Sequence, residues 1–294
     1  MLTGFYETQL FSSPTVVIGS FHCAPWYSRF EEAGPIDQGN TIVFPRTSVI
    51  IAQEGRRPFL SDPNQVVFYN LRQPYQRRIA SERGDHCEYF AFDPGLVVAA
   101  LRHYDPSVSD RQDEPFDFSH APSDASTYLL QRILVEQMRA HPDLEPIYVE
   151  ETCLEILDRT IATVFRFEAV KQRGFPAFRR THRHHRELVQ QTQAILNAHF
   201  CEPLLLQDLA NELYVSPYHL SRVFRRETGR TIHQYLEQIR LRVALEDVLP
   251  GGPDLSSVAQ RLGFSSHSHF TSAMRKLYGA SPSVLQNSLV SSLS

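Results

Sequence analysis

Two stretches in the C-terminal half of the chain repeat one pattern and decide the fold of that half. Residues 206–229 read LQDLANELYVSPYHLSRVFRRETG, and residues 255–279 read LSSVAQRLGFSSHSHFTSAMRKLYG. The apolar positions before the turn match at an offset of 49, and those after the turn match at an offset of 50. An internal repeat of this kind predicts two copies of one supersecondary unit, with one extra residue in the second turn.

Each copy has the pattern of a helix-turn-helix. Gly263 stands where the first helix of the second copy ends, and glycine can adopt the left-handed conformation that ends a helix. In the first copy Tyr214 stands near the corresponding place, so that turn is less typical. Ser216 followed by Pro217 is typical of an N-cap and a first helical residue. The second helix then buries one apolar stripe and keeps a polar outer face, as a recognition helix in the major groove requires.

A third helix is predicted between the two copies. Residues 231–249 keep apolar residues at helical spacing, and Thr231 and Gln234 fit a capping box at the start. The sequence PGGP at residues 250–253 ends the helix. One long helix would set the separation of the two recognition helices, so a single chain could read two successive segments of the major groove.

These motifs resemble the DNA-binding domain of the AraC/XylS transcription regulators over roughly residues 187–285. The resemblance implies seven helices carrying two helix-turn-helix units, with double-stranded DNA as the partner. It also implies base contacts from the first turns of both recognition helices. The matching segments are LA at Leu209–Ala210, SPYHLSRVFRRETG from Ser216, RLRVA from Arg240, VAQRLGF from Val258 and FTSAMRKLYGASP from Phe270.

The candidate DNA-binding residues fall into two groups. Positions in the first turns are carried over from the resemblance as base contacts, and His219 in the same turn of the first unit joins the DNA-binding set. Basic residues toward the helix ends are expected at phosphates, because cations there can neutralise the backbone. The first group is Tyr218, Ser221, Arg222, His267, Ser268, Thr271 and Ser272, and the second is Arg225, Arg226, Arg275 and Lys276.

The two units are not expected to bind equally. Many members of the family carry a basic residue where this chain has Ser272, and an aromatic residue where it has Met274. Many also carry an Arg after the final Pro, whereas here Pro282 is followed by Ser283. An Arg such as Arg222 can hold a guanine edge through two hydrogen bonds, but a Ser makes at most one short contact. We therefore expect the second unit to bind DNA less strongly than the first.

Charge divides the chain into an acidic and a basic part. Residues 1–165 hold 13 Lys and Arg against 23 Asp and Glu, and residues 166–294 hold 16 against 10. The basic segment AVKQRGFPAFRRTHRHHR at residues 169–186 contains no acid and reads as an exposed linker or arm. Its histidines, His182, His184 and His185, are taken as part of a solvated segment, because no Cys or carboxylate set completes a metal site. We expect domains at residues 1–165 and 187–294, joined by a basic linker at residues 166–186.

The acidic part is predicted to begin with strands and to end with helices. Short β-branched or aromatic runs separated by turn residues favour a β-barrel or sandwich. Apolar residues then recur at helical spacing in residues 123–140 and 146–165, which predicts two helices that pack on the barrel or against a second copy. The strand-like runs are residues 15–21, 40–46, 48–53, 65–71, 76–81 and 87–92.

The segment NQVVFYNLRQPYQRRIASERGDHCEYFAF, residues 64–92, resembles the cupin-type sensor domains of the same family. The fold class is thus α+β, with an N-terminal cupin-like β-barrel plus two helices and a C-terminal all-α domain. Weak candidates for ligand binding are the aromatic pair Trp26 and Tyr27 and the histidines His22 and His86. His22–Cys23 and His86–Cys87 invite a metal or redox reading, but adjacent residues on a strand face opposite ways, so structural positions are favoured.

The function expected is a DNA-binding transcription regulator, and more specifically an activator that would also contact RNA polymerase. A small molecule or a partner would act through the N-terminal part, and the chain would form a homodimer. No cofactor, metal or catalytic residue is assigned. The alternatives are a cupin-type metalloenzyme, a metal or redox sensor with an appended DNA-binding domain, or a DNA-repair protein. No long apolar run, signal sequence or CxxC pair occurs, which favours a reduced cytoplasmic protein without a membrane span.

Overall fold

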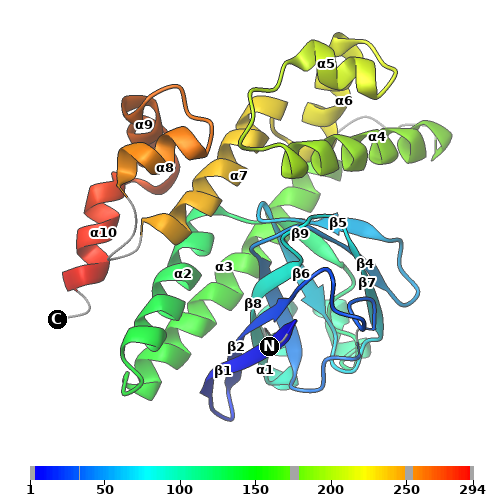
Figure 1. The fold of residues 1–294 in the computed structure, drawn as a ribbon. Coiled ribbons are helices and arrows are strands. Elements are labelled where there is room, and N and C mark those ends of the chain that lie inside the picture. Colours follow the sequence, from blue (N-terminus) through cyan, green and yellow to red (C-terminus); the bar gives the residue numbers. More distant parts are fainter. Residues whose placement is uncertain (1–3, 33, 173–178, 249–253, 292–294) are drawn as a thin grey trace. The chain divides into compact units, whose positions relative to one another are not determined.

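The computed structural model describes residues 4–32, 34–172, 179–248 and 254–291 (Figure 1). The chain divides into two compact units, residues 1–173 and residues 174–292. The first unit holds antiparallel sheets and helices, and the second is helical among its described residues. The expected α+β arrangement is therefore confirmed, and each unit is described by itself.

The N-terminal unit contains two antiparallel sheets. All six strand-like runs that the sequence indicated are strands, and the structure adds three strands that were not predicted, β1, β5 and β9. The six-stranded sheet has the order β1 (Phe5–Ser12), β2 (Val16–Cys23), β8 (Asp85–Phe92), β3 (Asn40–Pro45), β6 (Gln65–Tyr69) and β9 (His120–Pro122). The three-stranded sheet has the order β5 (Phe59–Ser61), β4 (Val49–Gln53) and β7 (Tyr75–Ile79).

The expected closed barrel is wrong, because the larger sheet is open. A sheet closes only when its last strand pairs with its first. Here β1 and β9 stand at the two ends of the larger sheet, and β4 pairs with β5 and β7 in a separate sheet. Strand count and turn spacing do not distinguish these arrangements, because closure depends on long-range pairing.

Alternation along β8 gives the larger sheet two different faces. Cys87 and Tyr89 point into the space between the sheets, where they line a cavity together with Val49 and Ile51 of β4. Glu88 and Phe90 point to the opposite face and are fully buried there. Successive residues of a strand face opposite sides, so one strand serves both the cavity and the core beneath the helices.

Helices cover the second face. The two predicted helices are α2 (Ala125–Ala140) and α3 (Pro146–Gln172), and the sequence analysis missed α1 (Pro94–Arg102) and a 3-10 turn η1 (Pro106–Asp110). The start of α1 has an ordinary signal, because the Asp93 side chain accepts hydrogen bonds from the first turn and Pro94 is the first helical residue. The apolar run of α1 is short and directly follows strand β8, so periodicity alone does not reveal the helix.

A buried ionic cluster ties α2 to the sheet. The fully buried Glu88 carboxylate on β8 pairs with Arg46 and lies 3.3 Å from Nη1 of Arg132 and 3.5 Å from Nη2 of Arg139 on α2. Arg46 also donates to the Tyr128 hydroxyl of α2, at 2.7 Å. Burial alone would raise the pKa of Glu88, but the charges of Arg46 and Arg132 outweigh it and hold that pKa at about 2. Removing one partner of such a cluster costs about 3–5 kcal/mol, because it leaves a buried charge uncompensated.

The C-terminal unit has seven described helices, which is the number that the family resemblance implies. The segment expected to be a linker, residues 166–186, is helical where it is described, because α3 runs to Gln172 and α4 begins at Arg179. Residues 173–178 lie outside the described part of the chain. The helices are α4 (Arg179–Ala198), α5 (Leu206–Glu212), α6 (Pro217–Thr228), α7 (Ile232–Asp247), α8 (Leu255–Arg261), α9 (His267–Tyr278) and α10 (Pro282–Ser291).

The predicted cap of α6 is confirmed, and α9 of the second helix-turn-helix unit has an equivalent cap that was not predicted. The hydroxyl of Ser216 accepts from the backbone N–H of His219 at 3.2 Å, and Ser266 caps α9 in the same way. Thr231 and Gln234 form the predicted capping box at the start of α7. The sequence repeat therefore includes the residues that cap the two recognition helices.

The turns of the two helix-turn-helix units have the same backbone conformation, but a different residue type stands at the left-handed position. Gly263 has φ 77° and Tyr214 has φ 55°, so both residues are left-handed. The next residue of each turn, Val215 or Phe264, donates to a carbonyl of the preceding helix at 3.0 Å. A left-handed conformation is strained for any residue with a Cβ, so the first turn holds Tyr214 at a cost that Gly263 avoids.

We predict that Gly263→Ala destabilises the C-terminal unit much more than Gly279→Ala does. Both glycines have φ 77°, but a Cβ at Gly263 would lie 2.6 Å from the Cys201 carbonyl oxygen, whereas a Cβ at Gly279 would meet nothing within 4 Å. We expect a loss of about 1–2 kcal/mol for Gly279→Ala from backbone strain. For Gly263→Ala we expect about 3 kcal/mol or more, because steric overlap adds to that strain.

Urea denaturation followed by far-ultraviolet circular dichroism measures both variants in the full chain. The fluorescence of Trp26, the only tryptophan, reports the N-terminal unit separately. Equal losses for the two variants would show that the close approach at Gly263 is not a real constraint.

Candidate nucleic-acid interface

The second helix of each repeat presents the same pattern of buried and exposed positions. Three residues of α6 and three of α9 form the buried stripe, at an offset of 50. The remaining positions of each helix are exposed or half-buried. The buried residues are Leu220, Val223 and Phe224 in α6, and Phe270, Ala273 and Met274 in α9.

The predicted base-contacting residues lie on the other faces of these two helices. In α6 the Tyr218 side chain is 74% exposed, Arg222 is exposed, and His219 and Ser221 are half-buried. In α9 Thr271 is half-buried, and its hydroxyl oxygen is buried without a hydrogen-bond partner among the described residues. The other α9 positions, His267, Ser268 and Ser272, are exposed.

Four exposed cations lie along these helices without a protein partner. The part of the chain that the structure describes offers no ion pair or hydrogen bond to the side chains of Arg222, Arg225, Arg275 or Lys276. Arg225 on α6 and Arg275 with Lys276 on α9 stand in the last turn of their helices. Long basic side chains with no internal partner are suited to phosphate or base-edge contacts.

Arg226 differs from the other basic candidates. Its guanidinium contacts Nδ1 of His185 on α4 and lies 2.8 Å from the Glu227 carboxylate. His185, which the sequence analysis placed in a solvated segment, is only 6% exposed. Burial first, and then the positive charge of Arg226, lower the pKa of His185. Arg226 therefore joins α4 to α6, a role that no local sequence signal could reveal.

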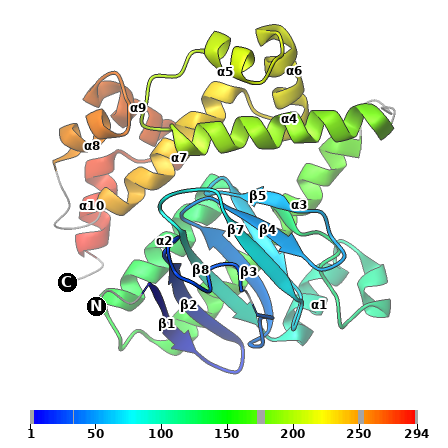
Figure 2. The same cartoon turned by 45° about the vertical axis from the view of Figure 1, so that its right-hand side comes forward.

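A second arginine holds several segments of the C-terminal unit together. Arg240, near the middle of α7, donates to three backbone carbonyls: those of Phe200 at 2.6 Å, Glu202 at 2.9 Å and Gly263 at 2.8 Å. Phe200 and Glu202 follow α4, whereas Gly263 is in the turn before α9. Helix α7 runs between the α5–α6 pair and the α8–α9 pair (Figure 2). Helix α7 thus contacts both recognition helices, and its Arg240 joins the α4–α5 loop to the turn before α9.

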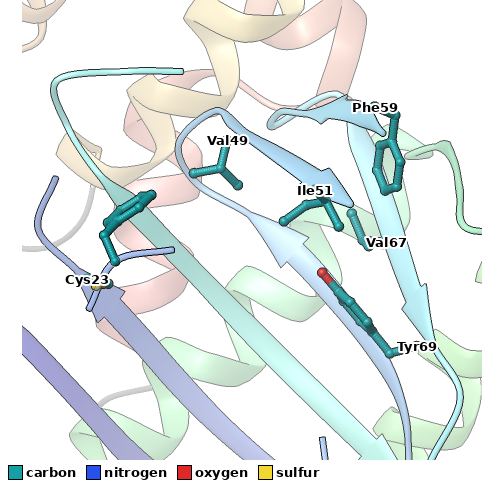
Figure 3. Close-up of a cluster of buried hydrophobic side chains, with 7 residues drawn as sticks. Cys23, Val49, Ile51, Phe59, Val67 and Tyr69 are labelled. Carbon is teal, nitrogen blue, oxygen red and sulfur yellow. The ribbon is translucent and has the colours of Figure 1, made fainter. Parts of the chain in front are cut away.

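The N-terminal unit contains a cavity of about 460 Å³ between its two sheets. Buried side chains from both sheets pack around it, among them Val49, Ile51, Val67 and Tyr69 (Figure 3). Of the four weak ligand candidates, Tyr27 lines this cavity. Trp26 is 65% exposed and does not line it, nor do His22 and His86.

The two His-Cys dipeptides are split by the strand pleat, as the sequence analysis expected. Cys23 and Cys87 are buried on the cavity side, and burial raises the pKa of both thiols. The His22 and His86 rings contact one another, with centroids 5.7 Å apart. Within the described ranges no three His, Cys, Asp or Glu residues come together in a group that could hold a metal ion.

Comparison with known proteins agrees with this geometry. Residues 209–288 match a family model described as a helix-turn-helix domain, and they include both recognition helices. This match supports the resemblance to AraC/XylS regulators over these residues. No helix that the structure describes is both long and apolar enough to cross a bilayer.

Three relatives show how much of the chain is shared. Regulatory protein PocR of Salmonella typhimurium is 31% identical over 87 residues, which are 30% of this chain and 29% of PocR. Probable transcriptional regulator LumQ of Photobacterium leiognathi is 26% identical over 183 residues, or 62% of this chain and 68% of LumQ. Regulatory protein SoxS of Escherichia coli is 27% identical over 99 residues, or 34% of this chain and 92% of SoxS. The match thus spans less than a third of PocR but nearly all of SoxS.

We predict an unequal effect of matched substitutions in the two recognition helices. Arg222→Ala should weaken binding to a selected DNA site by about tenfold or more and relax base preference in one half of it, because a bidentate guanine contact supplies about 1–3 kcal/mol. Ser272→Ala should change the affinity by about threefold at most, and Ser272→Arg should tighten binding. Arg275→Ala should weaken binding to all sequences alike if Arg275 contacts phosphate.

The measurement is a binding titration of each variant against a panel of mutated sites at one salt concentration. The sites come from selection on a random pool with the unaltered protein. If Ser272→Ala proves as damaging as Arg222→Ala, the two units read DNA equally and the expected asymmetry is wrong.

Proposed function

We propose that this chain is a sequence-specific DNA-binding regulator of transcription that reads two successive major-groove segments. The observation that carries the proposal is the repeated recognition helix, with unpartnered cations on α6 and on α9 and both helices held by α7. A helix with a polar outer face and basic residues in its last turn can enter the groove while its cations meet the phosphates. On this proposal Tyr218, Ser221 and Arg222 read one segment, and the shorter side chains of α9 read the next.

The N-terminal unit is proposed as the regulatory part. Its cavity, which lies between two sheets, is of a size that holds a small molecule. A ligand there would act as the effector, and the chain would work as an activator in contact with RNA polymerase. The similarity to LumQ, a probable transcriptional regulator, extends beyond the helix-turn-helix domain and supports a shared arrangement of two parts.

We predict that a fragment beginning at residue 174 folds and binds DNA without the N-terminal unit. The fragment corresponds to a compact unit, and SoxS consists almost entirely of the matching region. Its affinity should fall steeply with salt, with a slope of log affinity against log salt of about −3 or steeper, because each neutralised phosphate contributes about −0.9.

Circular dichroism and fluorescence anisotropy at four salt concentrations test this prediction. Arg225→Ala in the same fragment is the matched control, and it should reduce the slope by about one. A folded fragment whose binding does not depend on salt would contradict the proposed phosphate contacts.

Dimerisation is proposed through residues 123–165. Helix α3 exposes three large apolar side chains, namely Ile147 at 64%, Tyr148 at 41% and Leu154 at 39%. Sedimentation equilibrium should show a dimer of the full chain, and Ile147→Asp should shift it toward monomer without altering the circular dichroism spectrum. A strictly monomeric chain at high concentration would remove the dimerisation claim and leave the DNA-binding proposal intact.

A further inference from the structure

One wall of the cavity in the N-terminal unit is polar, whereas most of the rest is apolar. Four polar side chains meet there: Tyr69 from β6, Tyr75 and Arg77 from β7, and Asp85 from β8. Tyr69, Arg77 and Asp85 are each less than 9% exposed. The Tyr69 and Tyr75 rings pack together, with centroids 4.7 Å apart. We refer to these four residues as the polar wall.

Arg77 and Asp85 neutralise one another. Nη1 of Arg77 lies 3.3 Å from Oδ2 of Asp85, and Nε of Arg77 donates to the Phe30 carbonyl at 2.6 Å. The guanidinium also lies over the Phe21 ring, 4.6 Å from its centroid. The pair therefore brings one positive and one negative charge into the wall, and its net charge is zero while Asp85 is ionised.

The two tyrosine hydroxyls have unused hydrogen-bonding capacity. Neither the Tyr69 nor the Tyr75 hydroxyl bonds to any residue that the structure describes. Burial raises the pKa of both phenols, so both stay neutral and can donate a hydrogen bond. Figure 3 shows the Tyr69 hydroxyl directed toward Val49 and Ile51, away from its own strand. Tyr69 and Tyr75 both line the cavity, where a ligand can accept hydrogen bonds from these hydroxyls.

Apolar side chains beside the polar wall suit an apolar body. Phe21, Val43, Val49, Ile51 and Val67 line the cavity beside the polar wall. Such a surface gains free energy by excluding water from an apolar group of the ligand. A ligand that fits both regions therefore has an apolar body and one compact polar head.

The charge on that head follows from the charges already present. A carboxylate would bring a second negative charge close to Asp85, whose pKa burial already raises against the opposing effect of Arg77. The lining acids Glu7 and Asp37 would add to this repulsion, because Arg29 is already paired with Glu32 at 2.6 Å. Glu7 and Asp37 would attract an ammonium group, but at the polar wall that group would face the Arg77 guanidinium and compete with it for Asp85. A neutral head leaves the Arg77–Asp85 pair balanced.

We propose that the cavity binds a small molecule with an apolar body and an uncharged head that both donates and accepts hydrogen bonds, such as a carboxamide or an alcohol. The head accepts from the Tyr69 and Tyr75 hydroxyls and donates to Asp85. This inference rests on the proposed function, because it names the chemical class of the effector. A cavity of about 460 Å³ accommodates a ligand of small to drug-like size.

Three probes of nearly equal shape and different charge test the proposal on the full chain. They are 3-cyclohexylpropanamide, 3-cyclohexylpropanoate and 3-cyclohexylpropylamine, and ligand-observed NMR at pH 7.5 measures their affinities. We expect the amide to bind about tenfold or more tightly than either charged probe, because an uncompensated charge in a buried site is costly.

Two kinds of variant locate the site. Tyr69→Phe and Tyr75→Phe should each weaken amide binding by about fivefold, since each removes one hydrogen bond. Tyr104→Phe is the matched control, because it removes a hydroxyl from a ring stacked on Phe165 away from the cavity lining, and it should leave the affinity unchanged. Val49→Phe should abolish binding of the amide by filling the cavity. Urea denaturation followed by the fluorescence of Trp26, which reports the N-terminal unit, shows whether each variant is folded.

The outcomes separate the ligand class from the regulatory function. Tighter binding of the carboxylate or the amine, equal binding of all three, or no binding of the amide at 10 mM overturns the proposed class of ligand. So does an unchanged affinity in both Tyr→Phe variants. DNA binding is measured on the same preparation without probe, so its failure would count against the proposed regulator and not against the ligand class.

Discussion

The guanidinium of Arg240 connects the α4–α5 loop to the turn between α8 and α9. It donates to carbonyls of Phe200 and Glu202 on one side and to the carbonyl of Gly263 on the other. Burial lowers the pKa of Arg240, but three carbonyl oxygens offset the cost of removing the group from water. A lysine could not satisfy all three at this spread, because it lacks the planar fork of five donors. Arg240 thus holds together α7, the loop that leads into the first helix-turn-helix unit and the turn of the second unit.

The same contact explains why the two turns tolerate different residues. Gly263 lies so close to Arg240 and to the Cys201 carbonyl that a Cβ has no room. At the equivalent point of the first unit, Tyr214 adopts a left-handed conformation with its side chain 95% exposed. The second turn is therefore restricted by packing as well as by its backbone angle, whereas the first is restricted by the backbone angle alone. Sequence comparison of the two copies could show that they differ, but not that the cause was a guanidinium from another helix.

The sequence predicted what depends on local pattern and missed what depends on distant pairing. The caps at Ser216 and Thr231, the left-handed Gly263 and the six strand-like runs are all local signals, and the structure confirms them. The open sheet, the burial of His185 against Arg226 and the polar wall of the cavity each join segments far apart in the chain. Periodicity shows that Tyr75 and Arg77 share a face of a strand, but not that Asp85 lies opposite them. The DNA-contacting roles of α6 and α9 stay predictions.

Strand β8 links the proposed effector site to the proposed dimerisation helices. Asp85 and Cys87 face the cavity, while Glu88, one residue farther along, pairs with Arg132 and Arg139 of α2. A strand in the interior of a sheet moves as a unit, since it is hydrogen-bonded on both sides, here to β2 and β3. A ligand that hydrogen-bonds to Asp85 therefore acts on the strand whose Glu88 is paired with α2. Because the Glu88 cluster is buried and ionic, small displacements change its energy more than they would change an apolar contact. The N-terminal unit thus has a direct physical route from an occupied cavity to the helices through which two chains would meet.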